Sequence, residues 1–345
     1  MPKPVNRQWL LAARPKGMVK PSDFSLREVP VTPPGDGEVL VRNLYLAFEP
    51  AMRGWMEDRA GYIPPVPLGD VMRGVSVGQV IESNHPEYKP GDFVSGMLGW
   101  QEYATAGRGA MVSRVPPGAT LTQPLSVLGI TGITAYFGLL DVGKPQPGET
   151  VVVSGAAGAT GSVAGQIAKL KGCRVIGIAG GAAKCRWLVE QAHFDAAIDY
   201  RSEDVGKRLR ALSPDGVDVF FDNVGGPALD AVLEQIRLRA RIVLCGAISG
   251  YNAEERPPGP RNYVNLVMQR GRMEGFIVID YLPRAADAVK ELAAWVREGR
   301  IAYQEDIQQG FENAPRTFLR LFRSENVGKQ LLKLADPPIR DARPA

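Results

Sequence analysis

The feature that most constrains this chain is a glycine-rich turn between a β-branched run and a helical pattern. Residues 151–153 are valines, the turn reads Ala156-x-Gly158-x-x-Gly161, and residues 162–171 place apolar side chains at helical spacing. Gly158 lets the backbone approach a pyrophosphate, Gly161 lets the helix pack closely on its strand, and the helix N-terminus offers N–H groups to phosphates. With a β-like run at 174–178, the pattern predicts a dinucleotide-binding βαβ unit. The alternative is a tight turn that packs without a ligand.

The residues beyond this unit bear on which dinucleotide it binds. NAD-binding units place an acid about 20 residues after the turn, where it accepts the ribose hydroxyls. This chain has no acid there and instead has Lys184 and Arg186 after two glycines. A carboxylate would repel a 2′-phosphate and a lysine would attract it, so the sequence favours NADP(H) over NAD. The alternative is that both basic side chains are solvated residues at the start of a helix.

Length and charge exclude several other classes of protein. At 345 residues the chain exceeds what one core usually fills, so we expect two domains. The net charge of +4, from 41 basic and 37 acidic residues without a basic block, does not indicate nucleic-acid binding. No apolar run approaches the roughly 18 residues of a membrane span, and the apolar run at 9–13 is too short for a signal peptide. We therefore expect a cytoplasmic protein that binds neither nucleic acid nor a membrane.

The residues that most often bind transition metals are few and dispersed. The chain has three cysteines and two histidines, namely Cys173, Cys185, Cys245, His85 and His193. The cysteines stand far apart, and a closed zinc site needs Cys and His ligands clustered at short spacings. We therefore expect no metal and no disulfide framework.

The chain changes character twice along its length. Up to residue 126, short β-like runs alternate with turns, which predicts a compact β-barrel or sandwich. From 127 to 304, strands alternate with helices, which predicts a doubly wound parallel sheet. The strands expected in this part are 150–154, 174–178, 217–222, 241–245 and 275–279. Segment 305–345 is expected to return to the first domain through β segments at 301–307 and 328–334, with a disordered tail from Asp336.

Several short motifs together resemble a known family. They are residues 49–53 (EPAMR), 131–135, 158–170, 221–226, 245–252, 272–276 and 325–329. On these motifs the chain is similar to zinc-independent medium-chain dehydrogenases/reductases, in the branch of prostaglandin reductases, alkenal double-bond reductases and bacterial NADPH-dependent curcumin reductase. The resemblance implies a GroES-like β-rich catalytic domain at 1–126, an NADP-binding Rossmann domain at 127–304 and a C-terminal return to the catalytic domain. It also implies a homodimer.

The resemblance also implies a set of cofactor contacts. The turn would hold the pyrophosphate, Lys184 and Tyr200 would flank the adenosine 2′-phosphate, and the remaining residues would line the path to the nicotinamide. Asn223 as a cap of its own turn, and Tyr200 as a packing residue, are the alternatives. The full set is Gly158, Ala159, Thr160, Gly161, Lys184, Tyr200, Asn223, Cys245, Gly246, Ala247, Ile248, Ser249, Gly250, Tyr251, Phe276, Ile277, Val278 and Asn326.

Two departures from the family limit what can be carried over. Relatives often place Gly-Ser where this chain has Gly180 and Gly181, which removes one hydroxyl near the phosphate. Plant relatives have a tyrosine where this chain has Ala51, so substrate preference does not transfer. Four aromatic residues are candidates for the walls of an apolar substrate pocket, with packing as the alternative: Trp55, Tyr62, Trp100 and Tyr263.

The family implies NADPH-dependent reduction of the carbon–carbon double bond of small apolar α,β-unsaturated ketones or aldehydes. A hydride adds to the β-carbon, and charge develops on the carbonyl oxygen as an enolate. Tyr251, in a glycine-rich loop beyond a strand's carboxyl end, is the candidate catalytic donor; a residue that only packs against the cofactor is the alternative. Two other functions stay open, an NADPH quinone oxidoreductase and a non-catalytic NADPH-binding protein.

Overall fold

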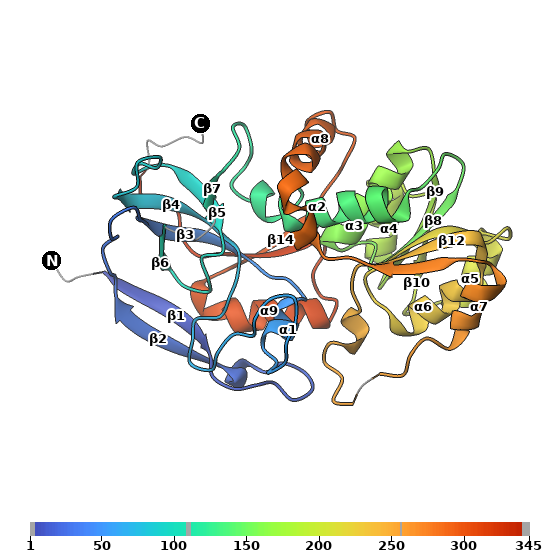
Figure 1. The fold of residues 1–345 in the computed structure, drawn as a ribbon, viewed down its shortest axis with the longest axis horizontal. Coiled ribbons are helices and arrows are strands. Elements are labelled where there is room, and N and C mark those ends of the chain that lie inside the picture. The colour runs from blue at the N-terminus through green and yellow to red at the C-terminus, as the bar shows by residue number, and fades with distance from the viewer. Residues whose placement is uncertain (1–3, 108–111, 256, 340–345) are drawn as a thin grey trace. The chain divides into compact units, whose positions relative to one another are not determined.

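The computed structural model describes residues 4–107, 112–255 and 257–339. The chain divides into two compact units, one formed by 1–126 with 306–345 and the other by 127–305. Figure 1 shows both units. Among the described residues, no helix is both long and apolar enough to cross a membrane.

The first unit is built on antiparallel strands. A hairpin pairs β1 (Val5–Leu11) with β2 (Phe24–Pro30). The larger sheet has the order β14-β15-β3-β4-β5-β7, with β6 paired to β3, so the C-terminal strands extend the N-terminal sheet. Its strands are β3 (Val39–Ala47), β4 (Ser76–Ser83), β5 (Phe93–Gly96), β6 (Tyr103–Ala106), β7 (Val112–Arg114), β14 (Glu305–Gln309) and β15 (Lys329–Lys333); its helices are α1 (Met52–Trp55) and α9 (Ala314–Phe322).

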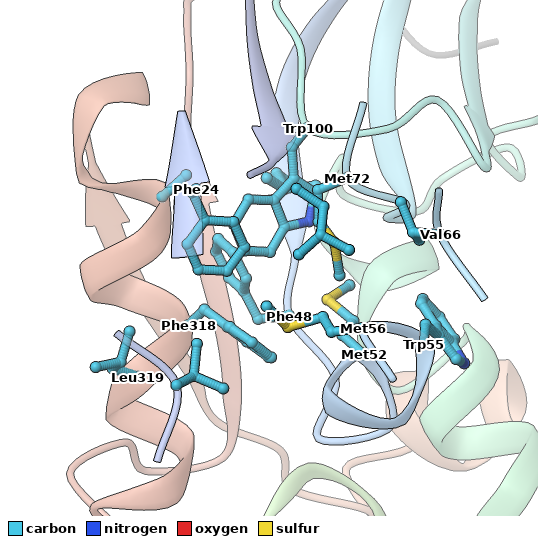
Figure 2. Packing of buried hydrophobic residues seen from close by; sticks show 14 of the residues in the cluster. Phe24, Phe48, Met52, Trp55, Met56, Val66, Met72, Trp100, Phe318 and Leu319 are labelled. Carbon is cyan, nitrogen blue, oxygen red and sulfur yellow. The ribbon is translucent and has the colours of Figure 1, made fainter. Parts of the chain in front are cut away.

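The core of the first unit joins residues from both ends of the chain. Figure 2 shows its apolar side chains. The Trp100 ring stacks on Phe24 at 5.2 Å between ring centroids and meets Phe48 edge-on at 5.0 Å. Phe318, on α9, contacts Trp100 edge-on at 5.6 Å. Aromatic rings bury large areas and favour these geometries, so they fix the C-terminal helix to the N-terminal sheet.

The second unit contains a parallel sheet with the order β10-β9-β8-β11-β12-β13. This is the doubly wound order 3-2-1-4-5-6, in which the strand order reverses between β8 and β11. The predicted sheet is confirmed. Its strands are β8 (Thr150–Ser154), β9 (Arg174–Ala179), β10 (Ala196–Asp199), β11 (Val217–Asp222), β12 (Ile236–Leu244) and β13 (Arg272–Gly275).

Helices cover both faces of this sheet. Figure 1 shows α3 and α4 on one side and α5, α6 and α7 on the other. Buried β-branched and aromatic side chains such as Val152, Ile176 and Phe220 fill the space between strands and helices. The helices of the unit are α2 (Ile130–Phe137), α3 (Ala159–Leu170), α4 (Ala182–Glu190), α5 (Val205–Leu212), α6 (Gly226–Leu233), α7 (Val264–Met268) and α8 (Ala285–Arg297).

The strand predicted at 275–279 is wrong. The structure has β13 at Arg272–Gly275, and a 3-10 turn begins at Val278. The Phe276 ring lies against Phe221, and Val278 packs with a cluster around Phe137. These apolar side chains are therefore directed into the interior rather than alternating along a strand, so packing overrides the β-propensity of the run.

The structure differs from the sequence expectations in three further places: an extra strand, a shifted strand and the C-terminal tail. Strand β10 was not predicted, and the segment expected at 301–307 is β14 at Glu305–Gln309. The tail is ordered further than expected, because the Ile339 N–H donates to Gln79 Oε1 at 2.9 Å and Gln79 Nε2 donates back to the Ile339 carbonyl at 3.1 Å. Gln79 is fully buried on β4, which anchors residues up to 339. Residues 340–345 of the expected disordered tail lie outside the described residues.

Candidate dinucleotide site

The turn between β8 and α3 is shaped by backbone crowding. Gly155 has a φ of +57°, which favours glycine. A Cβ at Gly161 would lie 2.5 Å from the Gly155 carbonyl oxygen, and one at Gly158 would lie 3.1 Å from the same oxygen. Gly155 therefore makes the sharp turn that the fingerprint assigns to its first glycine. Ala156 is fully buried instead, with its methyl group toward Gly177 of β9.

The start of α3 suits an anion. Gly158 is the N-cap residue, and no side chain caps it. Unsatisfied N–H groups and the positive end of the helix dipole make such a start favourable for phosphate. A Cβ at Gly161 would collide with the Gly155 backbone, so glycine lets the start of the helix pack closely on the turn. The predicted residues 158–161 therefore form a helix start with the backbone groups that a phosphate requires.

A buried polar network joins the carboxyl ends of β8 and β11. Ser154 Oγ donates to Asp222 Oδ1 at 2.6 Å, and the N–H groups of Val224 and Gly225 donate to the same oxygen at 3.0 Å. Asn223 donates from its backbone N–H to Ser154 Oγ at 2.9 Å and from Nδ2 to the Ser154 carbonyl at 2.7 Å. Asn223 thus ties the two strands together at the reversal of strand order, where such folds bind ligands.

Asp222 was not singled out from the sequence as a functional residue. It is fully buried, and burial raises the pKa of its carboxyl group, although the three hydrogen bonds oppose this shift. Its carbonyl oxygen accepts the N–H groups of Cys245 and Gly246 at 2.9 and 3.1 Å. A polar residue at the end of a buried strand was the available signal. Asp222 positions the loop after β12 as well as the turn after β11.

The loop after β12 lies over the turn after β11. The Ile248 N–H donates to the Asn223 carbonyl at 3.3 Å, and Ser249 Oγ donates to the Val224 carbonyl at 2.6 Å. Tyr251 turns back over this loop, since its hydroxyl accepts the Ala247 N–H at 3.1 Å. The structure therefore brings together Asn223 and the predicted residues 245–251.

A second group of predicted residues lies at the turn after β9. Gly181 is the N-cap residue of α4, and the Lys184 N–H donates to its carbonyl at 3.1 Å. A Cβ at Gly180 would lie 2.8 Å from the Tyr200 ring, so the absence of a side chain there lets the ring rest on the backbone. Lys184 and Tyr200 thus belong to one turn region.

An acid also lies at this turn, which sequence spacing did not reveal. Asp199 ends β10, the strand beside β9, and its Oδ1 accepts the Gly181 N–H at 2.8 Å. This hydrogen bond is the main cause that lowers the pKa of the Asp199 carboxyl group. The fingerprint places its acid at the end of the second strand of the unit, which is β9 here. Asp199 was missed because it stands at the end of the third strand, β10.

The remaining predicted residues are Phe276, Ile277, Val278 and Asn326. The Phe276 ring packs toward Gly138 and Phe221, so its side chain belongs to the interior of the second unit. Asn326 lies in the first unit, where its Nδ2 donates to the Gly328 carbonyl at 2.8 Å. Ile277 and Val278 follow Phe276 directly and are partly buried.

The suggested substrate walls separate into two kinds. Trp100 is fully buried in the aromatic core of the first unit, so its assignment as a pocket wall is wrong. Trp55 is buried beside the same core, whereas Tyr62 and Tyr263 are more than half exposed. An aromatic residue in a loop does not reveal from sequence whether it faces the core.

The cysteine thiols are not activated. Burial raises the pKa of Cys173 and of Cys185 to about 11, and that of Cys245 to about 12. Within the described ranges, no group of three or more His, Cys, Asp or Glu residues lies close enough to hold a metal ion.

The doubly wound sheet, the glycine turn and the loops at the reversal of strand order together define a dinucleotide-binding protein.

Comparisons with known proteins give the family. A family described as "N-terminal domain of oxidoreductase" matches residues 7–115, and one described as "Zinc-binding dehydrogenase" matches 159–297. The chain is 45% identical to NADPH-dependent curcumin reductase of Escherichia coli (strain K12), over 96% of this chain and 98% of that one. It is 39% identical to 2-alkenal reductase (NADP(+)-dependent) of Nicotiana tabacum, with the same coverage.

A solved structure agrees with these relatives. CurA from Vibrio vulnificus, in complex with NADPH, superimposes with a TM-score of 0.91 at 41% identity, covering 96% of this chain and 100% of that chain. The chain belongs to the medium-chain dehydrogenase/reductase family, in the branch that contains these reductases.

Proposed function

We propose that this protein is an NADPH-dependent enzyme that reduces the carbon–carbon double bond of α,β-unsaturated ketones or aldehydes. The observation that carries the proposal is the loop 245–251, with Tyr251 folded over it, fastened to the carboxyl end of β11. This loop lies beside the glycine turn at the reversal of strand order, where dinucleotides bind in this fold. The relatives named for NADPH-dependent curcumin and alkenal reduction support the same reaction.

The chain's own residues have three tasks in this reaction. Residues 158–161 would bind the pyrophosphate, Lys184 and Tyr200 would hold the 2′-phosphate, and Asn223, 245–251, 276–278 and Asn326 would line the way to the nicotinamide. NADPH, when bound, supplies the hydride that adds to the β-carbon of the substrate. As that bond forms, the π electrons move onto the carbonyl oxygen, and a proton from water then adds at the α-carbon.

Tyr251 is the candidate for stabilising the enolate oxygen. A hydroxyl that accepts one hydrogen bond keeps the capacity to donate its own proton. The Ala247 N–H therefore orients the Tyr251 hydroxyl without consuming that capacity. A donor held in place before the reaction contributes about 3 kcal/mol to the stabilisation of a developing oxyanion.

An oxidation screen tests the proposed reaction. NADPH consumption would be followed with an enone, an alkenal, a benzoquinone and a saturated aldehyde, and the products would be identified. We expect the enone and alkenal to be turned over to their saturated carbonyl compounds. Faster turnover of the quinone alone would favour the quinone oxidoreductase. The absence of turnover with tight NADPH binding would favour a non-catalytic protein.

Replacing Lys184 with alanine should raise the KM for NADPH and leave that for NADH nearly unchanged. The physical reason is the loss of a cation next to the 2′-phosphate, which NADH lacks. The control is Lys207→Ala on α5, which removes an exposed lysine elsewhere on the same unit. Equal effects on both cofactors would contradict the assignment of Lys184.

Activity should persist after exhaustive chelation. The reason is that the described residues offer no cluster of metal-ligating side chains, while the enolate is stabilised by hydrogen-bond donors in the proposed mechanism. Enone turnover would be measured before and after dialysis against EDTA and phenanthroline. Loss of activity that returns with zinc would overturn the metal-free mechanism.

We also propose that the protein is a cytoplasmic homodimer. The strand expected at 275–279, which the sequence places near the edge of the sheet as a pairing surface, is β13 in the structure. Strand β13 ends the sheet within the described residues and has a free edge. Beside it, α7 and the residue before it expose four large side chains, 51 to 72% accessible: Tyr263, Val264, Val267 and Met268. An apolar patch next to a sheet edge suits a second copy of this chain.

The dimer has its own test. Val267→Glu should weaken association by at least about tenfold, because a charge would be buried at the interface. The control is Leu26→Glu, which places a charge at an exposed position of the first unit. Light scattering at several concentrations gives the mass. A monomeric wild-type protein at micromolar concentration would refute the homodimer.

A further inference from the structure

Arg201 lies next to the turn that begins α4. Arg201 follows Tyr200 in the loop after β10, and its side chain is directed back toward Gly181. A Cβ at Gly181 would lie 4.0 Å from Arg201 Nη1, the nearest atom to that position. Lys184 lies in the first turn of α4, three residues after Gly181. Two basic side chains from different elements therefore flank the turn at Gly180 and Gly181.

Asp199 fixes the backbone of Arg201 to this turn. Its Oδ1 accepts the Gly181 N–H at 2.8 Å and the Arg201 N–H at 3.0 Å. Because one oxygen accepts both hydrogen bonds, the loop after β9 and the loop after β10 are held at a fixed separation. Arg201 is exposed, so its guanidinium group is accessible to a ligand at this turn.

The charge balance at the turn requires more than one cation for a phosphate. Asp199 carries a negative charge beside Gly181, and Glu203 Oε2 accepts the Asp199 N–H at 2.9 Å. Glu203 is paired with Arg208 at 3.1 Å. Lys184 and Arg201 together bring two positive charges to the turn against the one negative charge of Asp199, and two cations suit an added phosphate dianion better than one.

Arg186, the other basic residue in the sequence pattern, does not share this position. Positions two apart on a helix are separated by about 200° around the axis, so Lys184 and Arg186 point to different sides of α4. Lys184 is partly buried, and Arg186 is exposed. Arg186 therefore provides a matched control, a basic residue of the same type on a neighbouring element.

We propose that Arg201 is a specificity-determining residue that binds the adenosine 2′-phosphate together with Lys184, and that Asp199 is a positioning residue that holds Arg201 there. This inference rests on the proposed placement of the adenosine at the turn after β9. In this inference the second cation at the 2′-phosphate is Arg201, from the loop after β10, and not Arg186 of α4. A planar guanidinium forms paired hydrogen bonds with phosphate oxygens, which lysine cannot do.

Calorimetric binding of 2′,5′-ADP and 5′-AMP tests the role of Arg201 without turnover. Arg201→Ala should weaken 2′,5′-ADP binding by about 10- to 100-fold and leave 5′-AMP binding unchanged, because only the former carries the 2′-phosphate. Arg186→Ala should change neither by more than about twofold. Arg201→Lys should lie between wild type and Arg201→Ala.

Two variants of Asp199 separate positioning from charge. Asp199→Asn keeps a carbonyl oxygen that accepts both N–H groups, so 2′,5′-ADP binding should be kept or strengthened as a repelling charge is removed. Asp199→Ala removes the acceptor, so 2′,5′-ADP should bind more weakly while 5′-AMP is less affected. Equal weakening by both variants would overturn the positioning role.

The remaining outcomes distinguish this inference from the proposed function. If Lys184→Ala loses the preference for 2′,5′-ADP and Arg201→Ala keeps it, Arg201 has no such role while NADPH remains the cofactor. If Arg201→Ala behaves like Arg186→Ala, the inference is also overturned. If the wild-type protein does not prefer 2′,5′-ADP over 5′-AMP, the proposed cofactor and this inference both fail.

Discussion

Tyr251→Phe lowers the rate constant of hydride transfer to an enone by roughly 10- to 1000-fold, the range for losing an oxyanion donor. The substitution keeps the ring and removes the hydroxyl that accepts the Ala247 N–H. Ala247 is exposed, so water can replace this acceptor and the loop should keep its fold. The expected loss therefore reflects the missing interaction with the developing enolate or the cofactor ribose.

Stopped-flow absorbance of NADPH in single turnovers measures this effect. The affinity for NADPH, measured separately, should change little. Tyr88→Phe is the control, because it also removes a hydrogen-bonded hydroxyl, which donates to the Val112 carbonyl at 2.9 Å, from a residue with no proposed role in the reaction. An unchanged hydride-transfer rate in Tyr251→Phe would make Tyr251 a packing residue and assign enolate stabilisation to the cofactor ribose and solvent.

Lys329→Met destabilises the first unit by about 3 kcal/mol, the lower end of the range for breaking a buried ion pair from one side. The Lys329 side chain is 2% exposed; its Nζ contacts Glu49 Oε1 and lies 3.3 Å from the Phe48 carbonyl oxygen. Methionine fills the space but leaves the Glu49 carboxylate unpaired. The lower end applies because Glu49 retains 15% exposure, so water partly solvates its charge.

Urea unfolding followed by tryptophan fluorescence measures this loss. Combining Lys329→Met with Glu49→Gln should recover most of it, because no unpaired charge then remains. Arg300→Ala, which breaks an exposed pair with Glu298, should change stability by no more than about 0.5 kcal/mol. A loss in Lys329→Met no larger than in this control would show that the buried pair does not stabilise the unit.

Several elements of the fold could be predicted from local sequence. The valines of β8, Gly158, Gly161 and the helical spacing after them lie within about 20 residues, so local patterns reveal strand, turn and helix. The same periodicity located β9, β11 and β12. It failed at 275–279, where Phe276 packs against Phe221 and Val278 packs with the cluster around Phe137.

The candidate site is only partly visible in the sequence. The motifs around Asn223 and Tyr251 were found, and their adjacency is explained by Asp222, which binds Ser154 from 68 residues away. The roles assigned to the cofactor-binding residues and to Tyr251 stay predictions. Asp199 and Arg201 were missed because strand β10, which brings them beside Gly181, has no distinctive local pattern.

The sequence by itself determined where backbone must turn tightly, where strands and helices alternate, and which family the motifs resemble. Only the tertiary structure decided which distant groups meet. Gly181 meets Asp199 and Arg201 because β9 and β10 are neighbours in the sheet, and Glu49 meets Lys329, 280 residues away, because β15 joins the N-terminal sheet. Glycine conformations and hydrophobic periodicity depend on a few consecutive residues. Ion pairs and shared acceptors depend on strand order, and packing of the whole unit fixes that order.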